Sequence, residues 1–266
     1  MSRKPVVAGR FYPGDRRSLE RDLYAMIPRD VDKVDAIGAV VPHAGYMCSG
    51  GIAGKVYARL ERKDTYIILG PSHTGLGLPF ALSDEPWHTP LGDINVDIGL
   101  VELLLGNSEL FRVDRAGHVG EHSIEVQLPF LQKTSPGSLI VPITVQRWIY
   151  SELFDAARAV AMSVKDAGKK VMIIASSDMT HYESREAAGV KDRQAIEKML
   201  ELDAEGLFNI VRDEGISMCG VLPVTVMLAA ARELGAGRAE LVEYADSGEV
   251  TGDCSDVVGY AGIVVS

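Results

Sequence analysis

AVVPHAGYMCSGGIAG, residues 39–54, decides the fold that we expect for this chain. A short apolar run enters the stretch, His43 stands where the run stops, and Gly45 and Gly50 follow. Uninterrupted apolar runs of this length are typical of strands that are buried on both faces of a parallel sheet. The stretch therefore predicts a buried strand over Ile37–Val41 that delivers an imidazole to the loop beyond it.

Two further apolar runs end in the same way. Thr65–Leu69 is followed by GPSH, which ends in His73, and Lys170–Ser177 is followed by DMTH, which ends in His181. In an open α/β sheet, ligands bind in the crevice beyond the carboxyl ends of the strands. Three strands that each deliver an imidazole to that edge, with His43 on the first, predict a functional site there.

Strands alternate with helices along the rest of the chain, which predicts an α/β fold with a central, mostly parallel or mixed sheet. No low-complexity linker divides the sequence, so we expect a single domain over residues 1–266. Further strands are expected at Phe80–Ser83, Phe111–Val113, Leu139–Val145, Leu241–Tyr244 and Val257–Val265, and a turn at Trp87–Gly92. Helices are expected at Ser18–Met26, Gly51–Leu60, Asp97–Leu105, Ser151–Lys165 with Ser151 as N-cap, Glu186–Leu202, Ala204–Val211 and Cys219–Leu234.

Composition excludes several classes of protein. A formal net charge of -10 argues against nucleic-acid binding, which requires a basic surface. No apolar run approaches the ~18–20 residues that span a bilayer, and the N-terminal residues lack the apolar core of a signal peptide. Three cysteines without CxxC spacing favour a reducing compartment. We therefore expect a cytoplasmic protein that binds neither nucleic acid nor a membrane.

Asp178 stands three residues before His181, a spacing that puts both side chains on one face of a helical turn or tight loop. A carboxylate beside an imidazole orients it and raises its basicity, which suits acid–base catalysis. The alternative is an N-capping Asp178 and a solvated His181. His43 and His73, each taken alone, are equally compatible with structural histidines that hydrogen-bond a turn.

Cys219 precedes a predicted helix, whose positive end stabilises a thiolate. A thiolate there is a soft metal ligand or a nucleophile, and the alternative is a small buried residue. Cys48 and Cys254 have no comparable argument and are interpreted as structural.

His122 lies between Glu121 and Glu125 in a loop that we expect to approach the same crevice, although spacing alone does not place it in the site. His88 and His118 are interpreted as surface or turn residues. The sequence contains no phosphate-binding loop, dinucleotide fingerprint, nucleophile elbow or HExxH motif.

Several of these motifs, in chain order, resemble the Memo family. They are VAGRFYP at 7–13, VPHAGY at 41–46, SGGIA at 49–53, LGPSH at 69–73, EHSIE at 121–125, SSD at 176–178 with His181, and Cys219-Gly220 with Pro223. The matches run from near residue 5 to the final strand. The chain is identified on these motifs as a member of the family, which implies a three-layer fold like that of the class III extradiol dioxygenases. Those enzymes hold a non-haem iron on two histidines and a carboxylate.

The resemblance implies a role for each residue of the crevice. His43 and His73 would hold a metal and Cys219 would take the third ligand position. His181 would move a proton with Asp178 beside it, and His122 would join the pocket wall. A thiolate in place of a carboxylate moves the expected metal from iron alone toward copper or zinc.

Two functions are compatible with this set of residues. The first is a metal-dependent oxidoreductase of unknown substrate, which the complete set of His, Asp and Cys residues favours. The alternative is a non-catalytic protein that keeps the dioxygenase-like pocket for a peptide or small ligand. By the same resemblance, microbial members have a functional link to AMMECR-type and radical-SAM proteins.

Overall fold

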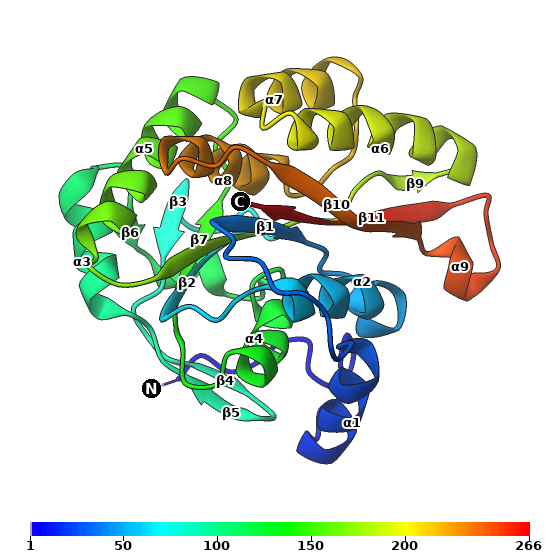
Figure 1. The fold of residues 1–266 in the computed structure, drawn as a ribbon, viewed down its shortest axis with the longest axis horizontal. Coiled ribbons are helices and arrows are strands. Elements are labelled where there is room, and N and C mark those ends of the chain that lie inside the picture. Colours follow the sequence, from blue (N-terminus) through cyan, green and yellow to red (C-terminus); the bar gives the residue numbers. More distant parts are fainter. Residues whose placement is uncertain (1) are drawn as a thin grey trace.

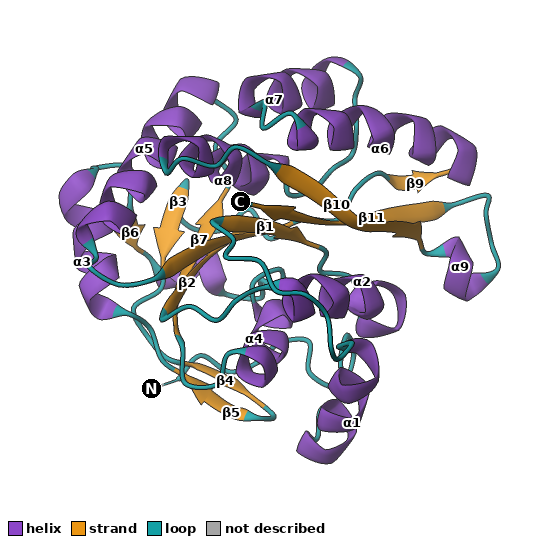
Figure 2. Cartoon of the chain, viewed as in Figure 1, coloured by secondary structure: helices purple, strands orange, loops and turns teal. Residues whose placement is uncertain are grey.

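The computed structural model describes residues 2–266, in which strands alternate with helices along the chain (Figure 1, Figure 2). The strands are β1 Gly38–Val41, β2 Thr65–Pro71, β3 Phe80–Leu82, β4 Trp87–Thr89, β5 Gly92–Ile94, β6 Arg112–Val113, β7 Leu139–Val145, β8 Val171–Ser176, β9 His181–Glu183, β10 Ala239–Asp246 and β11 Val257–Val265. The α-helices are α1 Arg16–Met26, α2 Tyr46–Arg59, α3 Ile98–Asn107, α4 Leu128–Thr134, α5 Tyr150–Asp166, α6 Arg185–Leu200, α7 Ala204–Asp213, α8 Val221–Glu233 and α9 Gly248–Thr251. Two 3₁₀ turns, η1 Arg115–His118 and η2 Glu125–Gln127, flank the loop between β6 and α4.

One mixed sheet runs through the described residues in the order β10-β11-β1-β8-β2-β7-β3-β6, with β9 paired to β11. Its centre, β1-β8-β2-β7, is entirely parallel, whereas β11 and β3 join it antiparallel. Val41 of β1 pairs with Ser176 of β8, and Leu69 of β2 pairs with Ala175. The three histidine-delivering strands are therefore neighbours in register, and their carboxyl ends meet at one edge. The predicted α/β fold class is confirmed.

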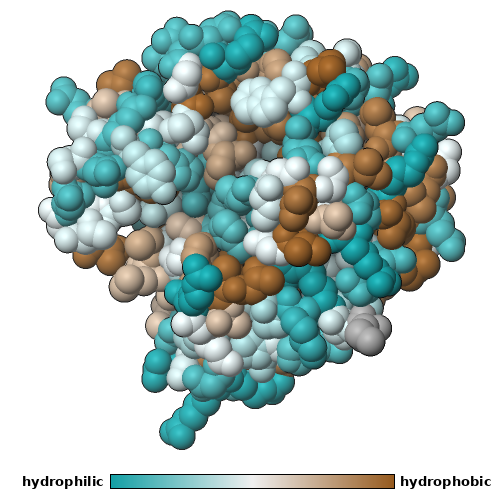
Figure 3. All heavy atoms as spheres, turned by 180° about the vertical axis from the view of Figure 1, so that it is seen from behind, coloured by the Kyte–Doolittle hydropathy of each residue, from teal (hydrophilic) through white to brown (hydrophobic). Residues whose placement is uncertain are grey.

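The sheet is the middle of three layers. Helices α3, α5, α6, α7 and α8 cover one face, and α1, α2 and α4 cover the other (Figure 1). α8 lies against the parallel centre and is buried along nearly its whole length, because its sequence is apolar all round. On the face seen from behind, hydrophobic side chains form separate patches between hydrophilic ones (Figure 3). Within the described part of the chain, no helix has the length and apolarity that crossing a bilayer requires.

Two local predictions were wrong, and a third was incomplete. α2 begins at Tyr46, five residues before the expected start, because its glycines permit a close approach and do not open the helix: a Cβ on Gly54 would collide with the backbone carbonyl of Met26. α5 begins at Tyr150, and Ser151 lies inside it without capping it. The turn expected at 87–92 is present at Pro90 and Leu91, where it joins the two strands of a hairpin, β4-β5, and Trp87 of this hairpin is fully buried.

Candidate metal centre

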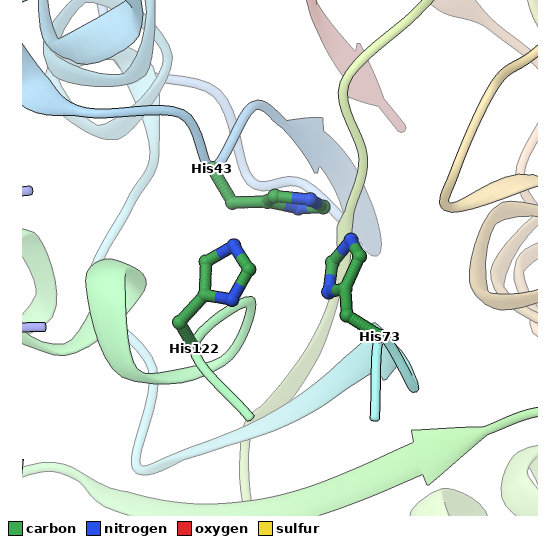
Figure 4. Close-up of side chains that lie close together, drawn as sticks. All are labelled: His43, His73 and His122. Carbon is green, nitrogen blue, oxygen red and sulfur yellow. The ribbon is translucent and has the colours of Figure 1, made fainter. Parts of the chain in front are cut away.

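Three imidazoles converge at the carboxyl edge of the parallel strands (Figure 4). His43 follows β1, His73 follows β2, and His122 comes from the loop between η1 and η2. One ring nitrogen from each residue lies within 4.8 Å of the others. The ring centroids are 5.2 Å apart for His43 and His73, 5.6 Å for His43 and His122, and 4.6 Å for His73 and His122.

His43 is held from both its backbone and its ring. Its backbone N–H and that of Ala44 donate to Asp178 Oδ1 at 2.7 and 3.3 Å. Its ring Nδ1 lies 3.0 Å from Ser176 Oγ. Burial, followed by the nearby charges of His73 and His122, lowers the pKa of His43 well below its usual value. The imidazole is therefore neutral at pH 7, which is the form that binds a metal.

Glu121 holds His73 and shapes the loop that carries His122. The His73 backbone N–H donates to Oε2 at 2.6 Å, and its Nδ1 lies 2.9 Å from Oε1. The backbone N–H groups of His122 and Ser123 donate to the same Oε1 at 2.9 and 2.8 Å. Burial raises the pKa of Glu121, but the hydrogen bond and charge of His73 outweigh it and bring the value to about 2. With Nδ1 engaged, His73 presents Nε2 to a ligand.

The N-terminal arm closes over His122. Phe11 meets the imidazole edge-on at 4.9 Å between ring centroids, and the Phe11 carbonyl accepts from the Tyr46 N–H at the start of α2 at 2.7 Å. Burial and the charge of His73 lower the pKa of His122, which favours the neutral ring.

Cys219 also reaches this centre. Its Sγ lies 3.2 Å from His43 Nε2 and accepts from the Asp178 N–H at 3.4 Å. Burial and then the negative charge of Asp178 raise the pKa of the thiol. The role of Cys219 as a thiolate ligand or nucleophile stays a prediction.

Asp178 and His181 do not form the pair that their spacing suggests. Asp178 accepts from the loop after β1, whereas His181 opens β9 and bonds Ser217. The His181 N–H donates to Ser217 Oγ at 2.7 Å, and its Nδ1 lies 3.0 Å from the Ser217 carbonyl oxygen. The catalytic roles of the two residues stay predictions, but it is Ser217 that orients the His181 ring.

All six predicted site residues line one pocket of about 590 Å³, and most of the remaining wall is apolar or aromatic. The six are His43, His73, His122, Asp178, His181 and Cys219, and the other lining residues include Phe11, Ala44, Tyr182, Val258 and Tyr260. The residues that line the pocket come from segments spread along the chain from the N-terminal arm to β11, so only the complete fold assembles the pocket.

Sequence reasoning missed several supporting residues. Glu121 was noted only as a neighbour of His122 and as part of the EHSIE motif, and it was given no role in the site. Ser176 was noted only as part of the SSD motif, and no signal marked it as a partner of His43. His118, expected at the surface or in a turn, ends the 3₁₀ turn η1, but its side chain is buried and lies edge-on to Trp87 with ring centroids 5.5 Å apart.

The model of the family described as Memo-like protein matches residues 3–264. This chain belongs to the Memo family. Among its relatives, a MEMO1 family protein of Methanosarcina acetivorans is 45% identical over 265 residues, which cover 99% of this chain and 98% of the relative. A MEMO1 family protein of Desulfurococcus amylolyticus is 40% identical over 277 residues, with 98% of each chain covered.

A similarity to a solved structure is more distant. The crystal structure of the uncharacterised protein JW3007 from Escherichia coli K12 is 14% identical to this Memo protein, with a TM-score of 0.47. The match covers 85% of this chain and 98% of that one.

Proposed function

We propose that this Memo protein is a metal-dependent redox enzyme that acts on a small molecule in the pocket at the carboxyl edge of its sheet. The observation that carries the proposal is the convergence of three imidazoles whose ring nitrogens lie within 4.8 Å of one another. The Cys219 thiol stands 3.2 Å from one of those nitrogens.

The donor set fits a metal ion. Two nitrogens that each lie ~2.1 Å from one ion are at most ~4.2 Å apart, so a small side-chain movement closes the observed spacing on an ion. His43 and His73 each use Nδ1 in a hydrogen bond and keep Nε2 for the ion, as metal-binding histidines generally do. His43 and His73 are therefore the first two ligands, and His122 and Cys219 compete for or share the remaining positions.

Imidazole with a thiolate suits iron, copper and zinc better than magnesium or calcium. When bound, iron or copper would supply one-electron redox chemistry, and zinc would compete for the site without supplying it. The chain itself contributes the rest. His181 stands on the pocket wall with its Nδ1 already engaged, so Nε2 is the atom that exchanges a proton with a substrate. The apolar walls, which include Phe11 and Val258, exclude water.

The pocket wall also bears on the substrate and the compartment. No Lys or Arg is among the residues that line it, which favours an uncharged small molecule over a phosphorylated one. The three cysteines are all free thiols, which agrees with the proposed cytoplasmic location. A functional link to AMMECR-type and radical-SAM proteins remains part of this proposal.

Metal content of protein purified without added metal tests the proposal. We expect wild type to carry or take up one iron or copper ion per chain, and His73→Ala to lose it. His88→Ala is the matched control, because His88 lies at the surface against Asp93 and away from the pocket. A wild-type chain that takes up no metal at micromolar concentration would contradict the proposal and favour the non-catalytic binding protein.

Cobalt substitution distinguishes Cys219 from His122 as the ligand at the remaining position. If Cys219 binds, Co²⁺-loaded protein shows a thiolate-to-metal charge-transfer band that Cys219→Ser abolishes and His122→Ala retains. If His122 completes the site alone, the band is absent from wild type. Oxygen consumption by iron- or copper-loaded protein then tests the redox part, and its absence with every reductant and candidate substrate would leave a metal-binding protein without redox activity.

A further inference from the structure

A fully buried hydrogen-bond chain runs behind the metal centre, from Tyr57 on α2 to the ring of His43. The Tyr57 hydroxyl donates to Gln127 Oε1 at 3.1 Å, and Gln127 Nε2 donates to Ser176 Oγ at 2.9 Å. Ser176 Oγ lies 3.0 Å from His43 Nδ1 and donates to the Ser123 carbonyl oxygen at 2.7 Å. Tyr57, Gln127, Ser123 and Ser176 are all essentially inaccessible to solvent, so their polar groups depend on neighbouring protein groups for hydrogen-bond partners.

The orientation of Gln127 is forced by its neighbours. Nε2 also donates to the Pro42 carbonyl oxygen at 3.0 Å. A carbonyl oxygen accepts hydrogen bonds and never donates them, so a flipped amide would set two acceptors against each other. Gln127 therefore donates to Ser176 and cannot accept from it.

The single hydroxyl proton of Ser176 has two places to go, the Ser123 carbonyl oxygen or His43 Nδ1. The carbonyl oxygen lies 2.7 Å away and has no proton of its own, so without the Ser176 proton two lone pairs would face each other at that distance. The Ser176 hydroxyl therefore donates to the Ser123 carbonyl oxygen. His43 Nδ1 then meets only a lone pair on Ser176 Oγ, and it makes this contact as a donor.

We propose that Ser176 is a positioning residue that fixes His43 as the tautomer with its proton on Nδ1 and its lone pair on Nε2. The lone pair of Nε2 then faces Cys219 Sγ, 3.2 Å away, and the thiol proton has two acceptors within reach, Nε2 and the Asp178 carbonyl oxygen at 3.7 Å. The hydrogen bonds along this path run in one direction: His43 Nδ1 donates to Ser176 Oγ, and Ser176 Oγ donates to the Ser123 carbonyl oxygen. The consequence for metal binding rests on the proposed function, whereas the tautomer itself does not.

The tautomer is observable in the full-length, metal-free chain. Long-range ¹H–¹⁵N correlation spectra at about pH 8 distinguish the two neutral tautomers. With six histidines in the sequence, the His43 signal is assigned by its loss in His43→Asn. We expect wild-type protein to show the proton on Nδ1. Ser176→Ala should populate the other tautomer, and Ser176→Cys, a near-isosteric change to a weak acceptor, should give a mixture.

Ser163→Ala is the matched control, because Ser163 is equally buried but lies in α5, bonded to Ala159 and Asn107. It should leave the His43 signal unchanged. A wild-type proton on Nε2 would overturn the proposal even if Ser176→Ala did not fold. So would an unchanged tautomer in both Ser176 variants.

Cobalt titration of the same proteins separates this inference from the proposed function. We expect the affinity of Ser176→Ala for Co²⁺ to fall ~10–100-fold, the usual effect of losing a group that orients a metal-binding histidine. If wild type binds no cobalt, the metal centre is wrong, and the spectra still decide the tautomer. If wild type binds cobalt and Ser176→Ala binds it equally well, Ser176 has no positioning role.

Discussion

Glu121 and His73 bond each other twice, through the His73 backbone N–H at 2.6 Å and its ring Nδ1 at 2.9 Å. The carboxylate is fully buried and also collects the N–H groups of His122 and Ser123. One side chain therefore sets both the direction of the His73 ring and the path of the loop that carries His122.

Glu121→Gln should weaken both the site and the fold. The amide places N–H groups where donors already converge, so we expect a stability loss of about 1–3 kcal/mol in chemical denaturation. Metal affinity should fall ~10–100-fold because His73 loses its orienting carboxylate. Glu109→Gln, on the exposed end of the α3–β6 connection, is the control. Wild-type metal affinity in Glu121→Gln would show that the carboxylate does not orient a ligand.

The Cys219 thiol should react slowly in the metal-free protein. Its raised pKa leaves little thiolate at pH 7, and each unit of pKa changes that fraction about tenfold. Mass spectrometry after timed iodoacetamide treatment should show Cys219 alkylated at least ~10-fold more slowly than the exposed Cys254. Asp178→Asn removes a negative charge that raises the thiol pKa, so it should speed alkylation of Cys219 and leave Cys254 unaffected. Equal rates for the two cysteines in wild type would contradict this account.

Arg3 should be essential for closing the N-terminal arm over the site. Its side chain donates to Glu125 Oε2 at 2.9 Å and to the Glu121 carbonyl oxygen, and lies 3.9 Å above the Trp87 ring. Arg3→Ala leaves the Glu125 carboxylate buried without its ion pair, at a cost of about 3–5 kcal/mol. Thermal and chemical denaturation measure the loss. Arg17→Ala, on the exposed side of α1, is the control and should cause no measurable loss of stability. Equal stability of the two variants would show that Arg3 does not hold the N-terminal arm in place.

Acid should remove a contribution that Asp97 makes to stability. Burial raises the pKa of Asp97, but hydrogen bonds from Lys169 and Thr65 outweigh it and leave the pKa lowered. A lowered folded-state pKa stabilises the protein above the unfolded value of ~3.9, and that stability is lost as pH falls through the folded value. Asp97→Asn should therefore cost about 1–3 kcal/mol at pH 7, and the difference from wild type should shrink below about pH 4. A pH-independent difference would show that the carboxylate charge does not matter.

Gly70 should tolerate no side chain. A Cβ there would lie 2.7 Å from Ile124 Cγ1 and would collide with Ser123 Oγ, in the loop that Glu121 organises. We expect Gly70→Ala to cost about 1–3 kcal/mol and to weaken metal binding, because overpacking displaces that loop. Gly51→Ala is the matched control on α2, where a Cβ meets nothing within 4 Å, and it should stabilise by about 0.5–1 kcal/mol. Metal affinity that survives Gly70→Ala would show that the loop accommodates the methyl group.

The sequence by itself determined the strands and the residues at their ends. The apolar runs before His43, His73 and Asp178 are long enough to bury on both faces, and burial of that kind requires helices on both sides of a parallel sheet. Those features are local, so a single sequence reveals them. The start of α2 was misplaced, since the pair Gly50 and Gly51 is as typical of a helix break as of a helix that packs closely, and Gly50 packs against Met26 inside α2.

Only the tertiary structure decided which side chains meet. His122 joins His43 and His73 because Glu121 gathers the surrounding N–H groups. Cys219 reaches the same point from the turn before α8, a helix that packs against the parallel strands. The contact of Glu121 with His73 joins residues 48 positions apart in the sequence, and that of Cys219 with His43 joins residues 176 positions apart. No local sequence pattern encodes such long-range contacts. They arise from the order and register of the strands, which depend on how the whole chain buries its apolar residues.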